Sequence, residues 1–174
     1  MKESTFIRYI TGKLPPTVHS QSMTFGSRSF NGTPDRYFDG PVADLWVEFK
    51  YIDAMPRDGI VGRVSDAKRG CYSSMQYDWM CRRYANGGNV LGIVGLRDRT
   101  AVIQVEPHQW LDGSSIQGAI PWLEVARKIE HFCTGGISAQ QTVHSGNRTG
   151  DGRAADQRSV GVRRVAKRPQ IRKR

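Results

Sequence analysis

Long apolar runs are absent from this sequence of 174 residues. A membrane-spanning helix needs about 20 consecutive apolar residues, so we expect none. Residues 1–10, MKESTFIRYI, lack the apolar stretch of a secretory signal peptide. Cysteine is scarce as well: Cys71, Cys81 and Cys133 have no CxxC spacing, which argues against a disulfide framework and against a zinc site. We therefore expect reduced thiols and a cytoplasmic location, in the host cytoplasm if the protein is viral.

Several motifs of well-known enzyme and binding classes are also missing. There is no GxxxxGK(S/T) loop, the serines form no nucleophile elbow, and the four histidines show no metal-ligand spacing. Patterns of a helix-turn-helix, a zinc finger or an RNA-recognition domain are absent too. These absences argue against nucleotide hydrolysis, serine-hydrolase chemistry, histidine–metal chemistry and sequence-specific readout of nucleic acid.

The net charge of +10 is distributed unevenly along the chain. Residues 141–174 contain ten basic and two acidic residues, a formal charge of +8, so the rest of the chain carries only +2. Apolar periodicity also ends near Gly136, which predicts a folded domain over residues 1–136 and a flexible basic tail over residues 137–174. Such a tail would bind DNA phosphates in a salt-sensitive way; a protein-binding or RNA-binding arm is the alternative. The basic residues expected to contact DNA are Arg36, Lys68, Arg69, Arg163, Arg164, Lys167 and Arg168.

The spacing of apolar residues in the first 136 positions predicts a mixture of helices and strands. Helical spacing is found in residues 3–14, 73–84 and 120–132. In the last of these, the expected buried stripe is Leu123, Val125, Ala126 and Ile129. Strands are expected at residues 17–25, 36–38 and 45–52, with a hairpin of residues 89–96 and 100–105. The predicted fold class is α/β, with a central mixed sheet of four to five strands flanked by helices.

Residues 31–50, NGTPDRYFDGPVADLWVEFK, combine a strand-like apolar run with four acidic residues and a lysine. If they form a hairpin with its turn near residues 40–43, Asp39 lies opposite Asp44 and Asp35 lies opposite Glu48. Alternation along the strand puts Glu48 and Lys50 on one face. Like charges that lie opposite each other destabilise a sheet, and a divalent cation removes that penalty. The plainer interpretation is that the acids and Lys50 form the solvated face of an amphipathic strand.

Four blocks of sequence together resemble the PD-(D/E)xK nucleases, in particular the VRR-NUC branch. They are the expected N-terminal helix with Glu3, then Thr33-Pro34-Asp35, then Glu48-Phe49-Lys50, and then SMQYDWMCRRYANGGNVLGIVGL at residues 74–96. The resemblance implies a restriction-endonuclease-like core with a metal site at one edge of its sheet. It also implies roles for particular residues: Asp35, Glu48 and the Phe49 carbonyl as metal ligands, Lys50 as the catalytic lysine, Gln76 as the helix glutamine and Glu3 as a further acid. Asp39 and Asp44 are possible substitutes for Asp35.

The function that this resemblance implies is metal-dependent cleavage of DNA. A metal-activated water would hydrolyse the phosphodiester bond, with Mg²⁺ as the cofactor and Mn²⁺ as its substitute. Structure-specific action on branched DNA, flaps or junctions, or simple nicking, is expected, and a homodimer and a phage-type origin are compatible with it. The alternative is a non-catalytic, basic-tailed nucleic-acid-binding adaptor or an inhibitor of a host nuclease. In the adaptor, Lys50 would point away from the carboxylates.

Overall fold

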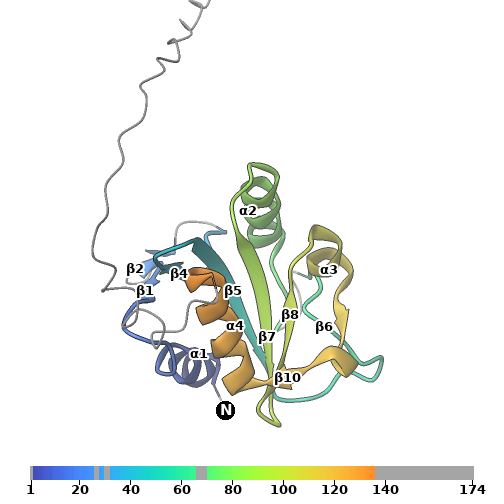
Figure 1. Cartoon of the computed structure of the whole chain (residues 1–174). Coiled ribbons are helices and arrows are strands. Elements are labelled where there is room, and N and C mark those ends of the chain that lie inside the picture. The colour runs from blue at the N-terminus through green and yellow to red at the C-terminus, as the bar shows by residue number, and fades with distance from the viewer. Residues whose placement is uncertain (1, 26–27, 30–31, 66–69, 136–174) are drawn as a thin grey trace, which may run out of the picture. The chain divides into compact units, whose positions relative to one another are not determined.

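The computed structural model describes residues 2–25, 28–29, 32–65 and 70–135 (Figure 1). The predicted tail at residues 137–174, with its basic residues, and the Lys68–Arg69 pair lie outside the described residues. The helices are α1 (Glu3–Thr11), α2 (Ser74–Ala85), α3 (Pro107–Asp112), α4 (Trp122–Thr134) and a 3₁₀ turn, η1 (Ile116–Gly118). The longer strands are β1 (His19–Ser22), β4 (Arg36–Asp39), β5 (Asp44–Ile52), β7 (Val90–Leu96) and β8 (Thr100–Gln104). The two-residue strands are β2 (Thr24–Phe25), β3 (Arg28–Ser29), β6 (Ile60–Val61), β9 (Ser114–Ser115) and β10 (Ile120–Pro121).

The central sheet has six strands in the order β1-β4-β5-β7-β8-β10. Strands β5 and β7 are parallel and every other pair in this sheet is antiparallel, so the predicted mixed α/β class is confirmed. The predicted count of four to five strands is too low. The strand of this sheet that sequence reasoning missed is β10, whose two residues are too few to produce an alternating pattern.

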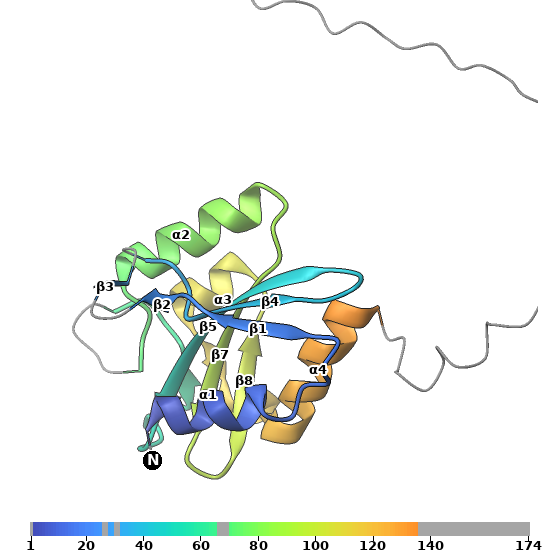
Figure 2. The same cartoon turned by 90° about the vertical axis from the view of Figure 1, so that its left-hand side faces the viewer.

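Helices cover both faces of this sheet (Figures 1 and 2). Helices α1 and α4 pack on one face, where Phe6, Phe49 and Ile129 belong to the larger apolar cluster. Helices α2 and α3 pack on the other face, where Met80 and Trp110 belong to a second cluster. Strand β5 contributes Leu45, Val47, Phe49 and Tyr51 to the first face. Its alternate residues, including Glu48 and Lys50, therefore lie on the α2 side.

Most of the predicted elements are present, with local corrections. Helix α1 ends at Thr11 because the Gly12 N–H closes it on Arg8 O, so the helix does not reach residue 14. The single strand expected over residues 17–25 is two strands, β1 and β2. Leu123 is 40% exposed, which corrects its predicted burial; Trp122 takes its place, since residues 122, 125, 126, 129 and 133 form the stripe that faces the sheet.

The short helix α3 was not predicted, because six residues give too little periodicity to detect. Within the described part of the chain, no helix combines the length and the apolar character that crossing a membrane requires.

Candidate active site

Strands β4 and β5 bring the predicted acidic residues together. Their observed register pairs Tyr37 with Trp46 and Asp39 with Asp44, as the hairpin interpretation predicted. The β4–β5 ladder begins at Arg36, so Asp35 lies just before the paired residues. The Oδ2 atom of Asp35 accepts a hydrogen bond of 2.9 Å from the Phe49 N–H. Because β5 is an interior strand, the predicted position at the edge of the sheet is wrong for Glu48 and Lys50.

Glu48 is the centre of this arrangement. Its side chain is 0% exposed, although carboxylates are almost never fully buried unless they are paired. Its Oε1 accepts hydrogen bonds from Lys50 Nζ and from Gln76 Nε2, each 2.5 Å long. Its Oε2 is buried and has no hydrogen-bond partner among the described residues. One oxygen is thus held by two donors, while the other retains its capacity to bind a ligand.

The start of helix α2 fixes the position of Gln76. Ser73 is the N-cap residue, and its hydroxyl accepts from the Gln76 N–H. In return, Gln76 Oε1 accepts from the Ser73 N–H at 3.0 Å, which completes a capping box. The amide oxygen of Gln76 is therefore used by the helix, and its Nε2 is directed to Glu48. The same side chain stabilises the start of α2 and orients the buried carboxylate.

The electrostatics follow from burial and from the proximity of two acids. Burial raises the pKa of Glu48 to about 8, and the charge of Asp35 adds to this rise while Lys50 opposes it. Burial also raises the pKa of Asp35, against the lowering effects of Lys50, the Phe49 N–H and Arg36. Burial alone would lower the pKa of Lys50, but Glu48 and Asp35 outweigh it, so this pKa is raised. Lys50 therefore keeps its proton, and the two carboxylates repel each other.

The oxygen atoms at this position suit a hard divalent cation. Mg²⁺ is usually bound by one or two carboxylates together with water and other oxygen ligands. Asp35 and Glu48 supply the carboxylates, and Glu48 Oε2 is buried without another partner in the described part of the structure. The N–H and C=O of a strand residue point toward the same neighbour. Since the Phe49 N–H is directed at Asp35, the Phe49 carbonyl is directed to that side as well. The residues present therefore fit such an ion.

Glu3 lies in the first turn of α1, and its charge contributes to the raised pKa values of both Glu48 and Lys50. However, no three His, Cys, Asp or Glu side chains among the described residues are grouped closely enough to hold a metal ion. Asp35 and Glu48 thus remain a pair, and the role of Glu3 stays a prediction. Asp39 and Asp44 pair with each other at the other end of the hairpin, which disfavours them as substitutes for Asp35.

A buried polar network beside Glu48 was not found from the sequence. Gly92 of β7 lies next to Glu48 in the sheet, and a Cβ at position 92 would overlap the hydroxyl of Tyr72. That hydroxyl donates to Gln104 Oε1 at 2.6 Å, and the Gln104 amide in turn donates to Ser114 Oγ. A glycine in the middle of a strand often marks the close approach of another group, and that was the signal available in the sequence.

Two hollows lie near the N-terminal turn of α1 and share Ser4 as a lining residue. A volume of about 730 Å³ is lined by Glu3, Ser4 and Lys50, together with residues that follow β5. A smaller one of about 280 Å³ is lined by Asp35 and by Arg36, which was predicted to contact DNA. Ser4 of α1 borders both. The N-terminal turn of α1 therefore borders one hollow that reaches Lys50 and another that reaches Asp35.

Comparisons with known proteins gave matches among solved structures only. No protein-family model matches the chain, and no curated protein matches it. Among solved structures, it is similar to a 1.6 Å structure of Hjc, a Holliday junction resolvase from the archaeal hyperthermophile Archaeoglobus fulgidus. The two chains are 12% identical over 72% of this chain and 96% of that chain, with a TM-score of 0.45. A likeness of that degree assigns neither the family nor the role of any residue, so both depend on the geometry of the site.

Proposed function

We propose that this chain is a metal-dependent DNA endonuclease with a restriction-endonuclease-like core, related to the VRR-NUC branch of the PD-(D/E)xK nucleases. The observation that carries the proposal is the environment of Glu48. It is fully buried, it is held through one oxygen by Lys50 and Gln76, and its second oxygen has no partner in the described part of the chain. Lys50 points toward the Glu48 carboxylate, whereas the adaptor alternative predicts that it points away.

Asp35, Glu48 and the Phe49 carbonyl would hold the cation, Mg²⁺ or its substitute Mn²⁺. When bound, such an ion polarises the phosphoryl oxygen and lowers the pKa of a coordinated water. Lys50 places a positive charge beside the carboxylates, where it can orient the attacking water or stabilise the negative charge that develops on the phosphate. Gln76 holds Glu48 in place through its Nε2, and so acts through the carboxylate as a positioning residue.

The proposed substrate is DNA, with structure-specific cleavage of flaps or junctions, or nicking of a duplex. The test is cleavage of a labelled panel of single strand, duplex, flap and four-way junction in Mg²⁺, Mn²⁺ or EDTA. The variants are Glu48→Ala and, as a matched control, Glu124→Ala, which removes an exposed glutamate from α4. Metal-dependent cutting that is lost only in Glu48→Ala is expected. Tight binding without cutting in either metal would contradict the proposal and favour an adaptor.

Lys50 gives a second test that separates catalysis from binding. Lys50→Ala is expected to abolish cleavage and to leave DNA affinity largely intact, because this side chain is 13% exposed and is paired with Glu48. Cleavage by the variant at the wild-type rate would exclude a catalytic role for Lys50.

A further inference from the structure

The smaller hollow beside Asp35 runs between helix α1 and the adjoining ends of β1 and β4. Ser4, Ile7, Arg8 and Thr11 line it from one face of α1, and Ser22 and Arg36 line it from the strands. We refer to it as the α1 groove. The α1 residues recur at intervals of three and four, so a whole side of the helix, and not a single turn, forms the wall. Asp35 also lines the groove, which therefore leads to the carboxylate pair.

Two arginines give the α1 groove its charge. Arg8 is exposed and Arg36 is half-buried. Among the described residues, neither guanidinium forms a hydrogen bond or an ion pair. By contrast, Arg63 and Arg83 are paired with Asp58 and Asp44. Arg36 lies close enough to Asp35 to lower the pKa of that carboxyl. The groove thus offers two cationic groups whose N–H donors are not used by any residue that the structure describes.

The charge and size of the groove restrict what can bind there. A guanidinium fork recognises phosphate groups with paired N–H donors. A volume of about 280 Å³ lies below the usual range of enclosed small-molecule sites, which begins at about 300 Å³. An extended anionic chain that crosses the groove suits it better than an enclosed ligand. The arginines of the groove place positive charge on the side of Asp35, and Lys50 places positive charge at the wall of the larger hollow.

We propose that the α1 groove binds the sugar-phosphate backbone of the DNA strand next to the bond that is cleaved, with Arg8 and Arg36 each contacting a phosphate. Nothing in the sequence marked Arg8 for this role. This inference rests on the proposed nuclease function, because it places the scissile phosphate at the Asp35–Glu48 pair. It adds a described part of the fold to the DNA-binding surface, which the sequence had assigned mainly to the tail.

The test is DNA binding by the full chain, measured in EDTA so that no cleavage interferes. The probe is a fluorescein-labelled 30-nucleotide DNA, single-stranded and as a duplex, and anisotropy gives the Kd at several NaCl concentrations. For Arg8→Ala/Arg36→Ala we expect weaker binding and a slope of log K against log[NaCl] that is shallower by about 1.4 to 1.8, since two phosphate contacts are lost. Arg8→Lys/Arg36→Lys keeps both charges and is expected to restore most of the slope.

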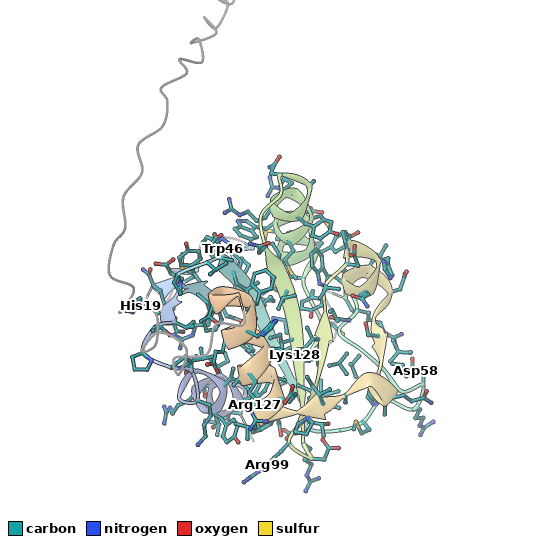
Figure 3. The ribbon with its side chains drawn as sticks, in the orientation of Figure 1. His19, Trp46, Asp58, Arg99, Arg127 and Lys128 are labelled. Carbon is teal, nitrogen blue, oxygen red and sulfur yellow. The ribbon has the colours of Figure 1, made fainter. Side chains whose placement is uncertain are left out.

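The matched control is Arg127→Ala/Lys128→Ala, which removes the same charge from α4 (Figure 3). We expect it to keep the wild-type slope. An equal change in both alanine pairs, or no change in the groove pair, would overturn the proposal. A cleavage assay of the wild type separates a failure of the groove proposal from a failure of the proposed nuclease function. If the wild type does not cut but the groove pair alone loses slope, the groove binds DNA and the chain is not a nuclease. If the wild type cuts and the groove pair behaves like the control, the groove assignment is wrong.

Discussion

The two faces of strand β5 are built for different purposes. On the α1 and α4 side, Leu45, Val47 and Phe49 are fully buried among apolar residues. On the α2 side, the strand buries Glu48, which has one oxygen without a partner in the described structure, and half-buries Lys50. A buried unsatisfied polar group costs about 1–3 kcal/mol. The first face therefore stabilises the fold. The second face lowers the free energy of unfolding, and in return it holds a carboxylate oxygen that can bind a ligand.

The largest effect on folding is expected from Phe49→Ala. The Phe49 ring packs against Phe6 with the ring centroids 5.6 Å apart and against Phe38 at 6.5 Å. Removing a fully buried Phe side chain lowers the free energy of unfolding by about 3–5 kcal/mol. Urea denaturation followed by circular dichroism measures this, with Phe49→Leu as the smaller change. A loss below about 1 kcal/mol would mean that this face contributes less than its burial indicates.

A substitution of the preceding residue, Glu48, should have the opposite effect: a large loss of cleavage with little loss of stability. Glu48→Gln keeps the shape and one oxygen acceptor but removes the charge, so we expect cleavage to fall by about 100-fold or more. In EDTA and at a pH well below 8, the free energy of unfolding should change little, because Glu48 is then largely protonated and a neutral acid is replaced by a neutral amide of the same shape. Cleavage assays and urea denaturation on the same preparation test both parts. A strongly destabilised variant would show that Glu48 is a structural residue.

The pH dependence of stability should also distinguish the two faces. The pKa of Glu48 is about 8 in the folded protein, against an ordinary value of 4.5 for a solvated glutamate. The folded state thus binds more protons than the unfolded state between these values, and its free energy of unfolding should fall as the pH rises from about 4.5 to about 8. The drop should amount to a few kcal/mol. Thermal denaturation in EDTA measures it, and Glu48→Gln should have lost this component. A pH-independent difference between the two proteins would contradict the assignment.

Gln76 offers the smallest and most selective test. Gln76→Ala removes both the capping acceptor and the donor to Glu48, so we expect a loss of about 1 kcal/mol in stability and about 10-fold in cleavage. Gln76→Glu keeps the capping box but removes the donor. It should therefore retain the helix start and still lose cleavage. Equal cleavage by Gln76→Glu and the wild type would limit Gln76 to its capping role.

The sequence was sufficient for the features that depend on local pattern. Alternation along residues 45–52 predicted which face Glu48 and Lys50 share, and the turn predicted the pairing of Tyr37 with Trp46. The contact between Gln76 and Glu48 joins residues 28 positions apart, and only the resemblance linked them. The burial of Glu48 and the position of Arg8 beside Asp35 depend on how α1 and α2 pack on the sheet. No short-range pattern encodes that packing.

Gly92 has a consequence for how natural variation in this chain should be interpreted. The position carries no functional group, yet any side chain there would collide with the Tyr72 hydroxyl, next to Glu48 in the sheet. Substitutions at position 92 should therefore be tolerated as poorly as substitutions at the acidic residues themselves. In a survey of variants, this glycine would be mistaken for a member of the chemical site. Its actual contribution is the empty space that the Tyr72 hydroxyl occupies, where burial raises the pKa of Tyr72 and the charge of Glu48 is close enough to raise it further.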